Sequence, residues 1–282
     1  MSGDDRRRGV VLVTVLWSVV LLSALAMAAS VTFRSFAGVM GVDRDRVQRD
    51  ALLTAGLEAS AGVIQASGDT PLRDIEITVA LSTGTVRSRL NDEGGRIDIG
   101  KAPLAVLASL LRSVGAPPGA ADSIARAIID LRVPINPSRP NADRRLPPTT
   151  LEQVLADVGR IPGMRAQWLA AMAPLTTVYG SETVNPLTAP RGVIAALPGI
   201  DPRNVELFLA ERRSSSADAD RLIRVLASAQ QFLAAKPQRV AAVELTAALA
   251  EGQVAAARAV IVVLRQDSEP YRVLTFTPVL LQ

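Results

Sequence analysis

Residues Arg6 to Phe33 read RRRGVVLVTVLWSVVLLSALAMAASVTF, and the run from Val10 to Ala29 contains 20 residues without a charge. In a helix with a rise of about 1.5 Å per residue this run is roughly 30 Å long, which matches the hydrocarbon core of a bilayer. Three arginines directly precede it. Because positive charge is retained on the cytoplasmic side, the sequence predicts a transmembrane helix over residues 10–33 with its N-terminus in the cytoplasm.

Three interpretations of this segment are open. The first is a plain membrane anchor. The second is a cleaved secretory signal, with small residues at 24–26 or 26–28, although the apolar core of such signals spans roughly 7–15 residues. The third is a prepilin leader, which the junction Arg8-Gly9-Val10 resembles: a short basic segment, a glycine and a retained hydrophobic helix. Prepilin leaders are cut after the glycine, so residues 1–9 would be removed and Val10 would become the N-terminus.

The fifth residue after this junction bears on the third interpretation. Most pilin-like proteins have Glu at that place, and a carboxylate in the bilayer core is tolerated only with a partner. Here the residue is Thr14, whose hydroxyl can bond to a carbonyl of its own helix. Thr14 therefore argues against an ordinary pilin subunit and fits one special subunit, the one at the tip of a fibre.

The composition excludes several kinds of site. The 282 residues include neither Cys nor His. Disulfides, thiolate sites, the commonest general base and the commonest transition-metal ligand are therefore absent. The net charge of +4 is mild, and the positively charged residues are almost all arginine. The composition removes the easiest chemistries without ruling out an enzyme; from the sequence as a whole we expect no enzyme and no cofactor.

The helix is expected to continue beyond the membrane, from residue 34 to about Ser67. Charged residues between 44 and 50 are expected to form a solvated face, and Gly68 to Pro71 to end the helix. Apolar residues recur at nearly helical spacing along this segment. They are Val47, Leu52, Leu57, Ala61 and Ile64.

After the helix, apolar residues recur at every second position instead of at helical spacing. Residues 75–79 and 86–90 alternate as half-buried strands do, and 96–99 is expected to add a third strand of an antiparallel meander. The acidic turn Asn91-Asp92-Glu93-Gly94-Gly95 lacks the regular ligand spacing of a calcium loop. We therefore predict a solvated hairpin turn there.

A helical and proline-punctuated segment follows, and strands return at the C-terminus over residues 239–249, 255–265 and 271–277. Neither group of strands is large enough for a stable sheet alone, so the two groups are expected to join. The predicted fold is α+β: a pilin-like long N-terminal helix packed on an antiparallel sheet, with a large α-helical insertion. The predicted divisions are 1–9 (leader), 10–33 (transmembrane helix), 34–100 (helix and first strands), 101–235 (insertion) and 236–282 (final strands).

Two similar phrases lie within the insertion, Ile161-Pro162-Gly163-Met164 and Leu197-Pro198-Gly199-Ile200. Each stands between helical patterns, which predicts helix-hairpin-helix-like units. In DNA-binding hairpins the backbone amides hold a phosphate. Here Arg165 and Asp201 occupy the places where a second glycine is usual, and Asp201 would repel a phosphate. Structural hairpins and no nucleic-acid partner are expected, with a membrane-anchored DNA-binding protein as an alternative function.

Several short phrases follow one another along nearly the whole chain. They are Arg8-Gly9-Val10 with Leu16-Trp17, Asn91 through Ile99, Leu151 through Val154, Ile161 through Met164, Leu175 through Tyr179, and Val184-Asn185 through Ala189-Pro190 to Leu197-Pro198-Gly199. In their order and spacing, the chain resembles the minor pseudopilin K family of the type II secretion system (general secretion pathway protein K). The resemblance implies a pilin-like α/β domain with a large helical insertion, which matches the pattern-based prediction.

The resemblance also implies a role and partners. Members of this family cap the periplasmic tip of the pseudopilus together with the minor pseudopilins I and J, above a shaft of the major pseudopilin. A prepilin peptidase processes them, and they are single-pass inner-membrane proteins with the C-terminal domain in the periplasm. A secreted binding domain with a cleaved signal is the remaining alternative.

One departure from the family concerns calcium. Family members often have an acidic run at the place of Asp130, of the form Asp-Trp-x-Asp-x-Asp, that contributes to calcium binding. Here only Asp130 remains, and Arg132 adds a positive charge. Asn141 and Asp143 could supply oxygen ligands, but two arginines follow them. The sequence therefore predicts no calcium site in this loop, and the alternative is a calcium site with ligands from elsewhere in the fold.

Overall fold

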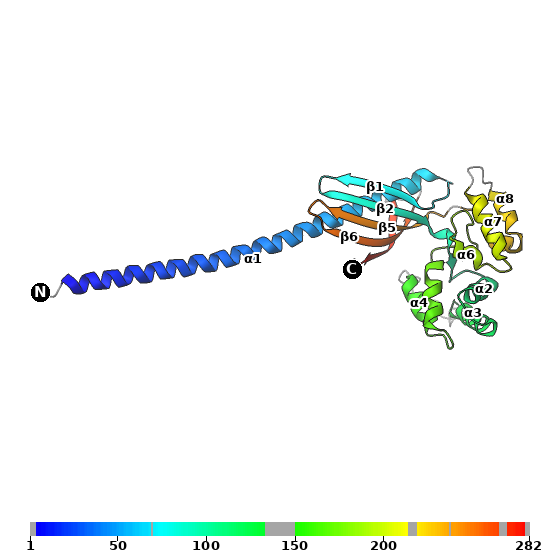
Figure 1. The fold of residues 1–282 in the computed structure, drawn as a ribbon, viewed down its shortest axis with the longest axis horizontal. Helices are drawn as coiled ribbons and strands as arrows, with labels where there is room; N and C mark the ends of the chain where they lie inside the picture. Colours follow the sequence, from blue (N-terminus) through cyan, green and yellow to red (C-terminus); the bar gives the residue numbers. More distant parts are fainter. Residues whose placement is uncertain are drawn as a thin grey trace, which may run out of the picture. The chain divides into compact units, whose positions relative to one another are not determined.

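The computed structural model describes residues 4–68, 70–132, 150–213, 219–236, 238–264 and 270–279, without the side chains of 4–14 and 29–42. The chain divides into two compact units, Met1–Leu52 and Leu53–Gln282. The helix α1 (Asp4–Ser67) contributes to both (Figure 1).

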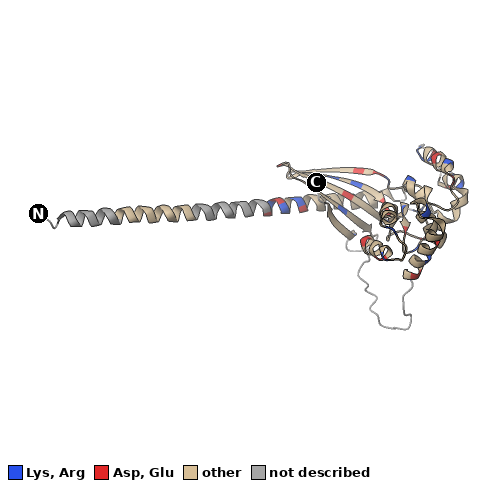
Figure 2. Cartoon of the chain, turned by 60° about the horizontal axis from the view of Figure 1, so that its bottom comes forward, with Lys and Arg blue, Asp and Glu red and all other residues tan. Residues whose placement is uncertain are grey.

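The first unit consists of the N-terminal part of α1. Among its described side chains between residues 15 and 28, the large apolar ones are exposed, from 55% for Val19 to 74% for Met27. Charges of both signs follow between Asp43 and Asp50 (Figure 2). Within the ranges given above, no helix combines the length and the apolar character that are needed to span a bilayer.

The second unit is built on a five-stranded antiparallel sheet in the order β1-β2-β5-β6-β7. Strands from before and after the insertion therefore share one sheet, as the sequence predicts. The strands are β1 (Ile75–Leu81), β2 (Gly84–Asp92), β5 (Val240–Leu249), β6 (Val254–Val263) and β7 (Tyr271–Val279).

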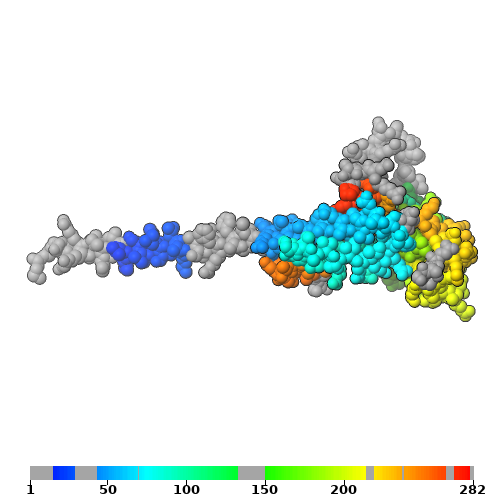
Figure 3. All heavy atoms as spheres, turned by 90° about the horizontal axis from the view of Figure 1, so that it is seen from above, coloured from blue at the N-terminus to red at the C-terminus, as the bar shows by residue number. Residues whose placement is uncertain are grey.

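The C-terminal part of α1 covers one face of this sheet. Leu53, Leu57 and Ile64 are at most 7% exposed. The closest approach is at Gly56, where an added Cβ would lie 2.7 Å from Leu245 and 2.9 Å from Val86. Glycine therefore allows the helix to pack directly on β2 and β5. Figure 3 shows the same part of α1, in light blue, beside β7, in red.

The opposite face of the sheet is polar. Glu76, Arg89, Glu244 and Arg258 are exposed and stand directly across from one another on β1, β2, β5 and β6. Arg258 also donates to Glu244 at 2.8 Å. Opposite charges on neighbouring strands each contribute about 0.2–1 kcal/mol, so this row helps to fix the strand register.

The insertion between β2 and β5 is mostly helical, and its helices gather beyond one end of the sheet (Figures 1 and 2). Its apolar core is separate from the sheet and includes the fully buried Leu107, Ile124, Met172 and Phe208. The elements are η1 (Glu93–Gly95), β3 (Ile97–Asp98), α2 (Leu104–Ser113), α3 (Pro118–Arg132), α4 (Leu151–Gly159), α5 (Ala166–Met172), η2 (Ala173–Leu175), β4 (Thr176–Thr177), α6 (Arg191–Ala195), α7 (Pro202–Arg212), α8 (Ala219–Val225) and η3 (Ala227–Phe232).

One local prediction is wrong. The segment 96–99 does not extend the meander: β3 leaves the sheet and pairs in parallel with β4. The 3-10 turn η1 causes this, because it redirects the chain directly after β2. Along the apolar stripe of α1, Val47 is 67% exposed, whereas Leu52, Leu57, Ala61 and Ile64 are buried. Val47 precedes Leu53 by six residues, which turns it about 120° away from the buried side of the helix.

Candidate functional site

The most polar buried region lies where the chain leaves the sheet, at the end of β2. Asp92 is only 5% exposed. Its Oδ1 accepts from the Gly94 N–H at 2.9 Å, and its Oδ2 accepts from Asn185 Nδ2 at 3.2 Å and from the Thr188 hydroxyl at 3.1 Å. Both oxygens are therefore satisfied, as a buried carboxylate requires.

Residues 184–189, which we call the clasp, tie together the two ends of the insertion. At the first end, the Asn185 N–H donates to the Gly94 carbonyl at 2.8 Å. At the second end, Val184 forms a parallel bridge with Leu233, and Asn185 Nδ2 reaches the Lys236 carbonyl at 3.4 Å. The clasp thus joins the exit from β2 to the return into β5.

The predicted solvated turn at residues 91–95 is wrong, because its centre is buried. Glu93 is 2% exposed and pairs with Arg96 at 3.1 Å. Gly95 is adjacent to the backbone of the clasp: an added Cβ would lie 2.7 Å from the Thr188 carbonyl carbon. The acidic character of the turn therefore serves internal hydrogen bonds and an ion pair, and Gly95 permits the close backbone contact.

Stability is expected to fall as the pH rises through Asp92 titration. Burial raises the pKa of Asp92 from 3.8 to about 6, the hydrogen bonds from Gly94, Thr188 and Asn185 lower it, and Glu93 raises it. Between these values the folded state holds a proton that the unfolded state has lost. The resulting stability is present at about pH 4 and lost above about pH 6, a change of at most roughly 2–3 kcal/mol.

Thermal unfolding of the purified protein between pH 4 and pH 7 measures this dependence. Asp92→Asn should show a smaller pH slope than the original protein, although burial of Asp98 also raises its pKa and leaves part of the slope. The control is Asp122→Asn, since the Asp122 side chain is 45% exposed in its ion pair with Arg112. Equal slopes for the Asp92→Asn and Asp122→Asn proteins would contradict the assignment.

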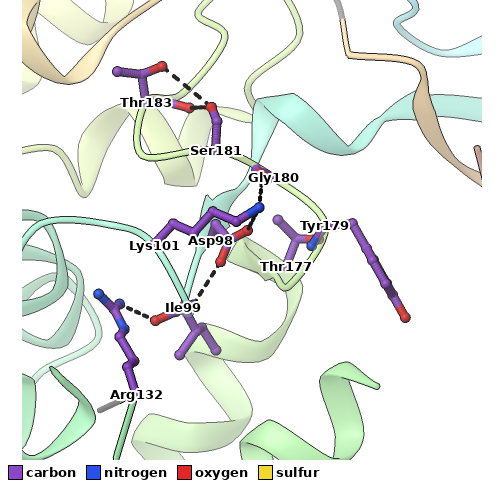
Figure 4. Close-up of polar contacts among 10 residues, drawn as sticks. Asp98, Ile99, Lys101, Arg132, Thr177, Tyr179, Gly180, Ser181 and Thr183 are labelled. Carbon is purple, nitrogen blue, oxygen red and sulfur yellow. Dashed lines mark hydrogen bonds and ion pairs between the residues drawn. The ribbon is translucent and has the colours of Figure 1, made fainter. Parts of the chain in front are cut away.

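A second buried carboxylate, Asp98, organises the chain directly after β3 (Figure 4). Its Oδ1 accepts from the Gly100 N–H at 2.7 Å, and its Oδ2 is 3.6 Å from Lys101 Nζ. Lys101 in turn donates to the Gly180 carbonyl at 2.7 Å. Burial raises the pKa of Asp98, and Lys101 lowers it. The lysine therefore joins the start of the insertion to the segment after β4.

Arg132 is held at the end of α3 by backbone carbonyls. It donates to Ala102 at 2.9 Å and to Ile99 (Figure 4). Asp130 points outward on the same helix and is exposed. Asn141 and Asp143 lie outside the described residues. Across the described part of the chain, no three Asp or Glu side chains gather in a way that could hold a metal ion.

Helices flank both predicted hairpins, and Gly163 and Gly199 have φ values of +88° and +72°. Asp201 is the N-cap of α7, where it accepts from the Arg203 N–H at 2.7 Å. Arg165 stands 4.9 Å over the Trp168 ring. The two residues that replace glycine thus have local structural partners. The identity of these hairpins as helix-hairpin-helix units stays a prediction.

The side chains of Gly9, Val10 and Thr14, at and after the predicted cleavage site, are not among those described, so the roles of these residues stay predictions. The polar residues of the clasp join the exit from β2 to the return into β5. Sequence patterns did not single them out as partners of Asp92. Both Val184-Asn185 and the turn at residues 91–95 stand out in the sequence. However, nothing in a linear sequence indicates that these two segments meet.

No model of a known protein family and no curated protein matches this chain. Among solved structures, the chain is similar to one in the GspK-GspI-GspJ complex from the type 2 secretion system of enterotoxigenic Escherichia coli. The two share 15% identity over 83% of this chain and 99% of that chain, with a TM-score of 0.48. At these values the likeness assigns neither a family nor a function.

Proposed function

We propose that this chain is a minor pseudopilin of a type II secretion system, located at the periplasmic tip of the pseudopilus. It is anchored in the inner membrane by residues 10–33 after a prepilin peptidase removes residues 1–9. Its partners are the minor pseudopilins I and J and the major pseudopilin below them. It has no catalytic role and requires no cofactor.

The observation that carries this proposal is the combination of leader and fold. A glycine follows three arginines and precedes 20 uncharged residues. The same segment begins a 64-residue helix whose C-terminal part packs on one face of an antiparallel sheet. A fibre subunit needs both features, because the helix joins the shaft while the sheet domain gives the subunit its outer surface.

The tip position is supported by the insertion and by Thr14. The helices between β2 and β5 gather beyond one end of the sheet (Figure 1). In a stacked fibre such a bulk leaves no room for a further subunit at that end. A terminal subunit also has no predecessor whose amine must be neutralised, so an uncharged residue at position 14 is acceptable there.

Crosslinking in cells that assemble the secretion system tests the tip position. A photoreactive residue is placed at position 14 or at position 16, which lie on nearly opposite sides of a helix at about 100° per residue. We expect adducts with the major pseudopilin from only one of the two positions. As a matched control, a probe at Leu104, which is 41% exposed on α2, should give no adduct with the major pseudopilin.

The tip position is contradicted if both positions yield adducts with the major pseudopilin. This chain would then have shaft subunits on two sides and would not cap the fibre. If neither position yields an adduct with any pseudopilin while the chain is present in the membrane, the plain anchor interpretation takes precedence.

A further inference from the structure

A cleft of about 460 Å³ lies between the start of β1, the end of β2 and the helices α6 and α7. Five arginines line it: Arg73, Arg96, Arg191, Arg212 and Arg213. We call it the cationic cleft. Two of these arginines are neutralised, because Arg96 pairs with Glu93 at 3.1 Å and Arg191 pairs with Glu206 at 2.6 Å.

The other three arginines form no ion pair with any residue that the structure describes. Arg212 is nevertheless fixed in place. Its guanidinium donates to the carbonyls of Pro186 at 2.8 Å and Ala189 at 2.6 Å, and it stands 5.3 Å over the Phe208 ring. An oriented guanidinium with no carboxylate partner is therefore built into the cleft.

The three arginines repel one another. The pKa of Arg212 is lowered to about 10, first by burial and then by the charges of Arg73 and Arg213, while Asp74 raises it. Like charges held close together cost free energy, although water partly screens the exposed Arg73 and Arg213. An anion bound among them would remove that cost, so the charge arrangement favours an anionic ligand.

The rim of the cleft is conformationally unusual. Asp74 has a φ of 49° and is the one non-glycine residue with positive φ in the described part of the chain. The Asn91 side chain holds it there by accepting from its N–H at 3.0 Å. Such backbone conformations cost free energy and concentrate at ligand sites.

The ligand class follows from the mixture of groups. The flat guanidinium fork binds carboxylates and phosphates in a bidentate manner. However, the carboxylates of Asp74 and Asp92 line the same cleft. A nucleic acid backbone presents only acceptors and would face these carboxylates unfavourably. An acidic peptide presents carboxylates to the arginines and backbone N–H donors to Asp74, which is exposed at the rim and pairs with Arg89 at 3.0 Å. Both oxygens of Asp92 are already satisfied within the protein.

We propose that the cationic cleft binds an acidic peptide segment, whose carboxylates pair with Arg73, Arg212 and Arg213. This function goes beyond the proposed role in secretion and does not depend on it. The segment belongs to a partner or client protein and is recognised by its closely spaced Asp and Glu side chains.

Fluorescence anisotropy with the full-length protein tests the proposal. The probe is a labelled peptide with three Asp-Glu pairs, and the comparison peptide has Asn-Gln pairs in their place. We expect binding of the acidic peptide that weakens with salt, and at least about tenfold weaker binding of the neutral peptide. The double variant Arg73→Gln/Arg213→Gln should weaken binding of the acidic peptide about tenfold or more. It leaves Arg212, which has internal hydrogen bonds, in place.

The matched control is Arg126→Gln/Arg160→Gln, which removes the same charge at exposed positions outside the cleft. It should bind like the original protein, and both double variants should keep its melting temperature. Equal weakening by the two double variants would show a general charge effect and overturn the proposal. So would the absence of peptide binding at low salt, or tighter binding of a single-stranded oligothymidylate than of the acidic peptide.

Discussion

Replacing Gly9 with Leu is expected to leave the full-length chain uncut in cells that contain a prepilin peptidase, whereas the original chain should begin at Val10. The resemblance of Arg8-Gly9-Val10 to a prepilin leader places the cut directly after this glycine. A branched side chain at that place removes the glycine on which the resemblance to a prepilin leader rests. The effect should be all or none. Intact mass measurement of the membrane-bound protein reports it directly.

Gly3→Leu is the matched control, since it introduces the same side chain in the same leader away from the junction. It should be processed normally. A mature N-terminus between Ala26 and Ser30 would instead identify a cleaved secretory signal and refute the pseudopilin proposal. An uncut original chain would leave only the plain anchor interpretation.

Gly95→Ala is expected to reduce the free energy of unfolding by about 3 kcal/mol, because it separates η1 from the clasp. The added methyl group would lie 2.7–2.9 Å from the backbone of Thr188 and Ala189, which cannot move aside as a side chain can. Overpacking of this kind typically costs about 1–3 kcal/mol, and the hydrogen bonds of the buried Asp92 would be strained in addition. Thermal or urea-induced unfolding of the purified protein measures the loss.

The control substitution is Gly62→Ala on α1, where nothing lies within 4 Å of the added methyl group. A helix interior favours Ala over Gly by about 0.5–1 kcal/mol, so this protein should be slightly more stable than the original. If Gly95→Ala unfolds at the same denaturant concentration as the original protein, the close contact between η1 and the clasp is not present in solution.

Local sequence patterns predicted the regular elements well, because each pattern reports a local preference. The alternation in residues 75–79 and 86–90 reflects a sheet with one face on α1 and one face in water. The capping box of Thr150 and Gln153 at the start of α4 is another local device of this kind, and both of its hydrogen bonds are present. The union of early and late strands in one sheet followed from a physical argument, since neither group is large enough alone.

The contact between residues 91–95 and the clasp was not predictable in the same way. Asn91 to Gly95 has the composition of a solvated turn, and only contact with Asn185 and Thr188 makes it a buried one. Such contacts join segments that are distant in the sequence, so no local period records them. The third strand was misassigned for the same reason: alternation in residues 96–99 indicates an extended segment but does not identify its partner.

The arrangement of the sheet has a consequence for the order of folding. The pairing of β2 with β5 joins residues on either side of the whole insertion, so it must close a very long loop. Pairings between distant segments form slowly, whereas the antiparallel helices of the insertion depend on nearby contacts. During synthesis, α1 emerges first and then the hairpin of β1 and β2, which alone is only marginally stable in water. The part of α1 that faces β5 stays uncovered until the last strands arrive, and until then the unfinished domain is exposed to aggregation and proteolysis.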